Sequence, residues 1–181
     1  MNSSLLNLLR CGGYILYAKH GEATVGEDRS NLNFYDCNTQ RNLSEAGIRQ
    51  AIYYGQLFRV LGIPVSYPIL TSPFCRAIET GQLAFGSANI QIDPFLFQIF
   101  RLSGNLPSVE QKGILDYLQS QLEGSPLQRS NKLIISHSFP QGIGLGQIPD
   151  MGTVIIKPLG QGKGYEIVTM LTLEDLANLS R

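Results

Sequence analysis

The order of strand and helix signals along the 181-residue chain most narrows the folds that it can adopt. Apolar runs typical of buried strands alternate with segments whose apolar residues recur at the helical period. This alternation predicts an α/β three-layer sandwich, with a mostly parallel central sheet and helices on both faces. Strands are expected at 13–18, 67–71, 131–136, 152–159 and 164–170, with a further brief strand in 89–97 that ends before Pro94, and helices at 43–62, 72–86, 107–124 and 172–179.

Chain length and organisation favour one domain over residues 1–181, because a chain of this size can bury a sizeable core by itself. No repeat or linker interrupts it. Residues 22–42 are polar and aperiodic, which predicts a long loop. A loop of that length is unusual in a compact domain and hints at function.

Helix ends are marked by capping residues. Ser44 is expected to cap the helix that starts after it, and Gly62 to end that helix in a left-handed turn. Ser72 is expected to cap the next helix, with Pro73 in its first position and Gly86 just past its end.

The charge balance argues against some partners. Fourteen basic and fourteen acidic residues give no net charge, so broad electrostatic binding of nucleic acid or a membrane surface is not expected. No apolar run approaches the roughly 18 residues of a membrane span. A local anion site needs only a few charges and is compatible with this balance.

The three cysteines are Cys11, Cys37 and Cys75. They form no CxxC pair and show no zinc spacing, so a structural metal is not expected. Their odd number favours a reducing compartment, here the cytoplasm, although a Cys37–Cys75 disulfide is an open alternative. The N-terminal segment, with Leu5, Leu6, Leu8 and Leu9, is typical of a short amphipathic helix and not of a signal peptide.

Three strand ends carry candidate functional residues. One strand runs into Lys19-His20-Gly21, another is followed by the helix that carries Arg76, and a third ends at His137. Because the carboxyl ends of parallel strands share one edge of a sheet, we expect these side chains to gather there. Two histidines, an arginine and a lysine suit a phosphate better than a divalent metal.

Each of these residues alone also has an ordinary structural explanation. A histidine at a strand end is often a hydrogen-bonded structural residue, and Arg76 alone could be a surface charge. Four motifs in order are harder to dismiss. They are "YAKHGEAT" (17–24), "NLSEAGIRQA" (42–51), "TSPFCRAIET" (71–80) and "LIISHS" (133–138).

These four blocks resemble, in the same order, those of the histidine phosphatase superfamily, also called phosphoglycerate mutase-like. The resemblance implies that His20 is a nucleophile forming a phosphohistidine, that Arg76 clamps phosphoryl oxygens and that His137 donates to another. Lys19 stands where the family has arginine. The resemblance implies neither a metal nor a cofactor. Residues expected to contact or orient the substrate are Gly21, Glu22, Arg41 and Ser138.

Two positions depart from the family pattern. Lys19 keeps the positive charge but lacks the bidentate fork of arginine, which predicts weaker or less well oriented phosphate binding. Gln98 stands where many members place a glutamate that acts as general acid, and it cannot donate a proton in that way. Asp93 is the candidate replacement, and Asp36 in the long loop is another.

The leading hypothesis is a metal-independent phosphatase acting on a small phosphomonoester or on a phosphohistidine of a protein. The alternative is a weakened or inactive phosphate-binding, regulatory domain of the same fold, which Lys19 and Gln98 motivate. A mutase is disfavoured, because the stretch after Arg76 lacks the glutamate-rich, glycine-containing segment that mutases have. Loops 22–42 and 93–107 would set specificity, but they name no substrate, and the sequence sets no oligomeric state.

Overall fold

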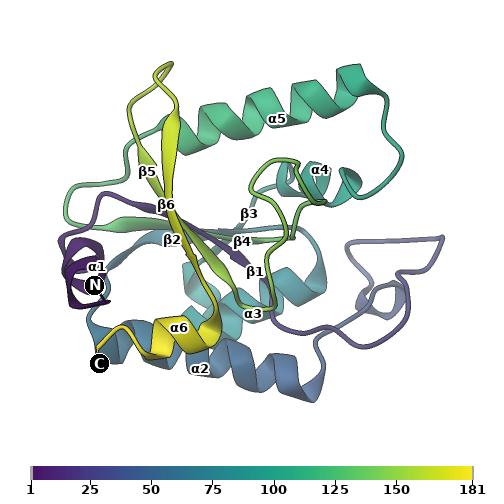
Figure 1. Ribbon diagram of the computed structural model, residues 1–181. Helices are drawn as coiled ribbons and strands as arrows, with labels where there is room; N and C mark the ends of the chain where they lie inside the picture. Colours follow the sequence, from purple (N-terminus) through teal and green to yellow (C-terminus); the bar gives the residue numbers. More distant parts are fainter. Residues whose placement is uncertain (1, 181) are drawn as a thin grey trace.

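A six-stranded sheet forms the centre of the computed structural model, which describes residues 2–180. The strand order is β3-β2-β4-β1-β5-β6 (Figure 1). The first four strands are parallel to one another, and β5 pairs antiparallel with both β1 and β6. The predicted mostly parallel sheet with a C-terminal hairpin is confirmed. The strands are β1 (Ile15–Lys19), β2 (Val65–Thr71), β3 (Ile90–Ile92), β4 (Asn131–Ser136), β5 (Thr153–Pro158) and β6 (Tyr165–Leu171).

Helices cover both faces of the sheet, which confirms the predicted three-layer sandwich (Figure 1). One buried cluster joins the sheet to α1, α2, α3 and α6, and a second joins it to α4 and α5. Strand β1 contributes side chains to both clusters. Leu16 and Ala18 belong to the first, and Ile15 and Tyr17 belong to the second. The helices are α1 (Asn2–Cys11), α2 (Glu45–Leu61), α3 (Cys75–Phe85), α4 (Leu96–Arg101), α5 (Ser108–Glu123) and α6 (Leu173–Ala177), with 3-10 turns η1 (Cys37–Thr39) and η2 (Ser87–Asn89).

Capping was predicted correctly for both ends of α2 and for the C-terminal end of α3, where Gly86 is the cap, but wrongly for the N-terminal end of α3. The Ser44 hydroxyl accepts a hydrogen bond from the Gly47 amide, and Gly62 ends α2 in the left-handed conformation. Helix α3 begins only at Cys75, so Ser72 is not its cap and Pro73 is not its first residue. The Ser72 hydroxyl instead forms a hydrogen bond with the His137 side chain.

The loop over residues 22–42 follows the expectation of a long irregular segment. It contains only η1 and an isolated bridge between Ala23 and Leu43. A disulfide joins Cys37 in this loop to Cys75 at the start of α3, which is the alternative that the sequence left open. The Gln40 side chain also accepts from the Cys75 amide, which attaches the loop further to the start of α3.

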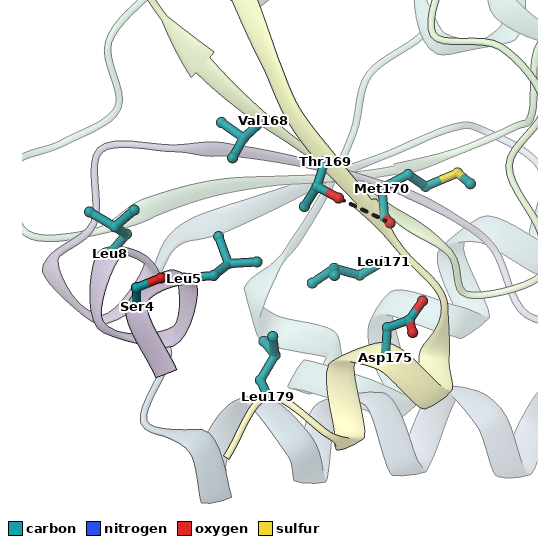
Figure 2. Close-up of a pocket in the computed structure, with 9 residues that line it drawn as sticks. All are labelled: Ser4, Leu5, Leu8, Val168, Thr169, Met170, Leu171, Asp175 and Leu179. Carbon is teal, nitrogen blue, oxygen red and sulfur yellow. Dashed lines mark hydrogen bonds between the residues drawn. The ribbon is translucent and has the colours of Figure 1, made fainter. Parts of the chain in front are cut away.

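A separate apolar groove of about 510 Å³ lies between α1, β6 and α6 (Figure 2). It shares no lining residue with the pocket described below. Across residues 2–180, no helix is both long and apolar enough to cross a bilayer.

Candidate active site

The carboxyl ends of β1, β4 and β2 meet at one pocket of about 330 Å³. Lys19 lies opposite Ser136 in the parallel register of β1 and β4, and the His20 amide donates to the Ser136 carbonyl. The expected gathering of both histidines and the cations is therefore observed. The pocket is lined by Lys19, His20, Glu22, Ala23, Arg41, Arg76, Phe100, Ser103, His137, Ser138 and Asp150.

His20 is buried and its two ring nitrogens have different environments. Its Nδ1 lies 2.7 Å from the Gly21 carbonyl oxygen, so Nδ1 carries the proton and donates it. Its Nε2 accepts from Arg76 Nε at 3.2 Å. Burial, followed by the charge of Arg76, lowers the pKa of His20 to about 3. The imidazole is therefore neutral at physiological pH, and its unprotonated Nε2 accepts the hydrogen bond from Arg76.

Arg76 is almost fully buried, and Asp28 from the long loop already occupies its fork. Nη1 and Nη2 donate to the two carboxylate oxygens of Asp28 at 2.8 and 3.2 Å. Nη1 also donates to the carbonyl of Arg41, and the guanidinium lies over the Phe74 ring. The hydrogen bonds from Arg76, first among the favourable contacts, hold the pKa of Asp28 below its usual value despite partial burial.

Lys19 forms the second ion pair of the pocket. Its Nζ lies 2.7 Å from Asp150 Oδ1, and about a quarter to a third of each side chain is exposed. The backbone fixes this arrangement, because the Lys19 amide donates to the Gly152 carbonyl and the Met151 amide donates to the His20 carbonyl.

His137 is held from three sides. Its Nε2 lies 2.7 Å from the Ser72 hydroxyl, and the Tyr17 hydroxyl donates to its backbone carbonyl. The rings of Phe74 and Phe100 pack against its imidazole, whose centroid is 5.4 Å from that of His20. Burial, with His20 next, lowers the pKa of His137 well below its usual value.

The residues expected to contact substrate divide into two groups. Glu22, Arg41 and Ser138 line the pocket, and Glu22 accepts a hydrogen bond from Ser44 Oγ at 2.6 Å. Gly21 does not line it. A Cβ at Gly21 would lie 2.7 Å from the Gly47 carbonyl oxygen, so its small size lets the segment after β1 pass close to α2.

The expected acid candidates lie outside the pocket lining. Asp93 follows β3, the edge strand two positions from β4, and accepts from the Phe95 amide. Asp36 caps η1, and Gln98 accepts from Arg101. Neither aspartate lines the pocket that contains His20.

Sequence reasoning missed Asp28, Ser103 and Asp150. Asp150 follows a stretch rich in glycine and proline that carries no recognised motif, so its place beside Lys19 depends on the fold alone. Among the described residues, no group of three histidine, cysteine or acidic side chains is placed to hold a metal ion.

Among the comparisons with known proteins, only the one with solved structures found matches. No protein-family model matches the chain, and no curated protein sequence matches it significantly. Solved structures do match. Protein histidine phosphatase SixA complexed with tungstate has 17% identity and a TM-score of 0.57, over 90% of this chain and 99% of that one.

Two further structures give similar values. Alpha-ribazole phosphatase from Shigella flexneri is 15% identical, with a TM-score of 0.57 over 88% of this chain and 96% of its own. A mutant phosphoserine phosphatase from Entamoeba histolytica in complex with phosphoserine is 14% identical, with a TM-score of 0.56 over 90% and 98%. The chain therefore has the fold of these phosphatases, as the four sequence blocks predicted.

Proposed function

We propose that this chain, which has the fold of the histidine phosphatases, is a metal-independent phosphatase. It would hydrolyse a phosphomonoester or a protein phosphohistidine through a phosphohistidine on His20. The observation that carries this proposal is the geometry of His20: Nδ1 donates its proton to the Gly21 carbonyl, which leaves Nε2 unprotonated beside Arg76, and burial lowers the pKa of the imidazole to about 3. A neutral imidazole with an unprotonated Nε2 can act as a nucleophile once the substrate displaces the Arg76 Nε–H that Nε2 accepts here, and Arg76 and Lys19 line the same pocket to bind the anion.

In the first step, Nε2 of His20 attacks phosphorus while the bond to the leaving group breaks. The leaving group takes the electron pair, and the phosphoryl group stays on Nε2. Positive groups stabilise the charge that spreads over the three oxygens. Arg76 contributes its fork only where the substrate phosphoryl group takes the place of Asp28, and Lys19 contributes a point charge.

The substrate class follows from what surrounds the pocket. Neither Asp93 nor Asp36 lines it, and of its two carboxylates Glu22 accepts from Ser44 while Asp150 is ion-paired with Lys19. Leaving groups that need little protonation, such as phenols or the imidazole of a phosphohistidine, are therefore favoured. An open groove of about 650 Å³ adjoins the pocket through Lys19, Ser103 and Ser138. This groove gives room for a substrate much larger than a phosphate ion.

The test is hydrolysis of para-nitrophenyl phosphate by the wild type and by His20→Ala, each with and without EDTA. We expect activity in the wild type, none in the variant, and no effect of EDTA. Equal rates for the two proteins across pH 5 to 8 would overturn the proposal.

One observation favours the second candidate, a phosphate-binding domain without turnover. Both cations beside His20 are already paired with carboxylates in this structure. Calorimetric binding of orthophosphate by a wild type that hydrolyses none of a panel of phosphomonoesters or phosphohistidine peptides would favour this candidate.

The proposed location needs a separate test. The odd cysteine count favours the cytoplasm, but the Cys37–Cys75 disulfide favours an oxidising compartment, because structural disulfides are rare in the cytosol. The disulfide carries more weight, since it is a defined bond and the count is only a statistical argument. Acid quenching of cells followed by thiol alkylation decides: an oxidised pair places the chain outside the reducing cytosol, and a reduced pair places it in the cytoplasm.

A further inference from the structure

We infer that Asp150 is the general base that activates water for hydrolysis of the phosphohistidine. This inference rests on the proposed function and extends it to the second step, for which the sequence supplied no residue. Asp150 lines the same pocket as His20, and its carboxylate lies 2.7 Å from Lys19 Nζ.

The other carboxylate among the described pocket-lining side chains is that of Glu22. Glu22 accepts from Ser44 Oγ, and Ser44 in turn caps α2, so its carboxylate is bound to a structural element. Asp150 forms its ion pair with the flexible side chain of Lys19, and about one-third of the Asp150 side chain is exposed. Both side chains are partly buried, but only that of Glu22 is tied to a helix cap, and we therefore assign the base to Asp150.

The backbone around Asp150 is held in place at a conformational cost. Met151 is fully buried and adopts φ 56°, the left-handed region that side chains other than glycine rarely occupy. Its amide donates to the His20 carbonyl, and the Gly152 amide donates to Pro149. Such strained residues concentrate at functional sites. Here the turn buries Met151 in the core and leaves Asp150 at the pocket.

The groove supplies the route for water. Pro149 and Lys19 line the open groove, while Asp150 and Lys19 line the pocket, so the carboxylate stands where the two join. Once the leaving group departs through the groove, water can enter the same way and meet Asp150 before it meets the phosphohistidine.

The chemical step balances as follows. The water oxygen forms a bond to phosphorus, and Asp150 takes one proton from that water. The bond between phosphorus and Nε2 breaks, and its electron pair returns to Nε2, which regenerates neutral His20. Orthophosphate leaves with the other proton of the water, and Asp150 releases its proton to solvent. Lys19 stabilises the phosphoryl oxygens during this exchange.

The test separates the two steps by rapid-quench kinetics with an aryl phosphate. In Asp150→Asn, we expect phosphorylation of His20 to stay within about threefold of wild type and dephosphorylation to slow by about 100-fold, a typical general-base contribution. Phosphohistidine should then accumulate to nearly one per chain. Acetate should restore dephosphorylation to Asp150→Gly, and Asp150→Glu should retain part of it.

The matched control is Asp116→Asn, which removes an exposed Lys–Asp pair on α5 and should change neither step. Equal slowing of both steps in Asp150→Asn and Asp150→Glu, or wild-type rates in both, would overturn the inference while leaving the phosphatase proposal intact. Absence of phosphohistidine and of turnover in the wild type would overturn both.

Discussion

Two ion pairs beside His20 place the same kinds of charge in different surroundings. Arg76 and Asp28 form a bidentate pair whose side chains are 3% and 12% exposed. Lys19 and Asp150 form a single contact whose side chains are 24% and 34% exposed. Removing one partner of a buried pair leaves an uncompensated charge, whereas an exposed pair contributes little.

This difference indicates that the two pairs have different tasks. The Arg76 pair joins the long loop to α3, and the adjacent Cys37–Cys75 disulfide joins the same two segments. In this structure it holds the long loop against α3, and the Arg76 fork is released only when a phosphoryl group takes the place of Asp28. The Lys19 pair borders the open groove and can exchange partners when a phosphoryl group arrives.

Breaking the buried pair gives the largest expected effect. Arg76→Ala should lower the free energy of unfolding by about 3–5 kcal/mol, because Asp28 is left buried without its partner. It should also abolish phosphatase turnover, because the guanidinium that binds the phosphoryl oxygens is lost. Lys19→Met, its counterpart in the exposed pair, should cost less than about 1 kcal/mol. Urea unfolding of both variants measures this. Equal losses would contradict the distinction between the two pairs.

Removing the disulfide tests whether the buried pair depends on it. Cys37→Ser with Cys75→Ser should lower stability by about 2–4 kcal/mol, because the bond closes a long loop over a separation of 38 residues. Turnover should fall as well, since the loop that carries Asp28 loses one attachment to α3. Thermal melts of oxidised and reduced wild type provide the same comparison without mutation. Turnover unchanged by reduction would show that the remaining contacts, the Arg76–Asp28 pair and the Gln40 hydrogen bond, hold the loop without the disulfide.

Acid titration separates the ion pairs from the histidines. The pKa of His20 is lowered to about 3 in the fold, from an ordinary value of 6.5, so the unfolded chain binds more protons below pH 6.5. Stability is therefore fully present above pH 6.5 and falls as pH drops toward 3, by about 1.4 kcal/mol per unit from His20 alone.

The Arg76–Asp28 pair should not contribute to this loss near pH 5, because the pKa of Asp28 lies below its ordinary value of 3.8. His20→Asn should therefore show a shallower decline than wild type between pH 6.5 and 5 in denaturant melts. A decline of the same slope in both proteins would place the acid sensitivity elsewhere.

Lys19→Arg gives the smallest expected effect. It restores a bidentate fork on the exchangeable side, and we expect KM for an aryl phosphate to fall by a few-fold with kcat little changed. Steady-state kinetics measures both. A rise in KM would mean that Asp150 holds the arginine fork more tightly than a phosphoryl group can.

Much of the fold follows from the sequence because its signals are local. The apolar period of α2, its Ser44 cap and the Gly62 end agree in one prediction. Prediction failed where a long-range contact used the same residue. Ser72 looks like a helix cap in sequence, but its hydroxyl bonds His137 across 65 residues.

The site residues also divide into those that local sequence signals predict and those that only the folded chain brings into place. His20, Arg76 and His137 stand at strand ends or in motifs, so their gathering could be predicted. Asp28 and Asp150 lie in segments without regular structure, and only the folded chain brings them to Arg76 and Lys19. Nothing in the spacing of the sequence marks either aspartate as a partner.

The central claim is that His20 carries the phosphoryl group. Rapid quench at alkaline pH with ³²P-labelled aryl phosphate, followed by peptide mapping, tests it directly. The account predicts an acid-labile, base-stable label on the peptide that contains His20, formed at least as fast as turnover and absent from His20→Ala. Turnover without any label on His20, or a label on His137 instead, would contradict it.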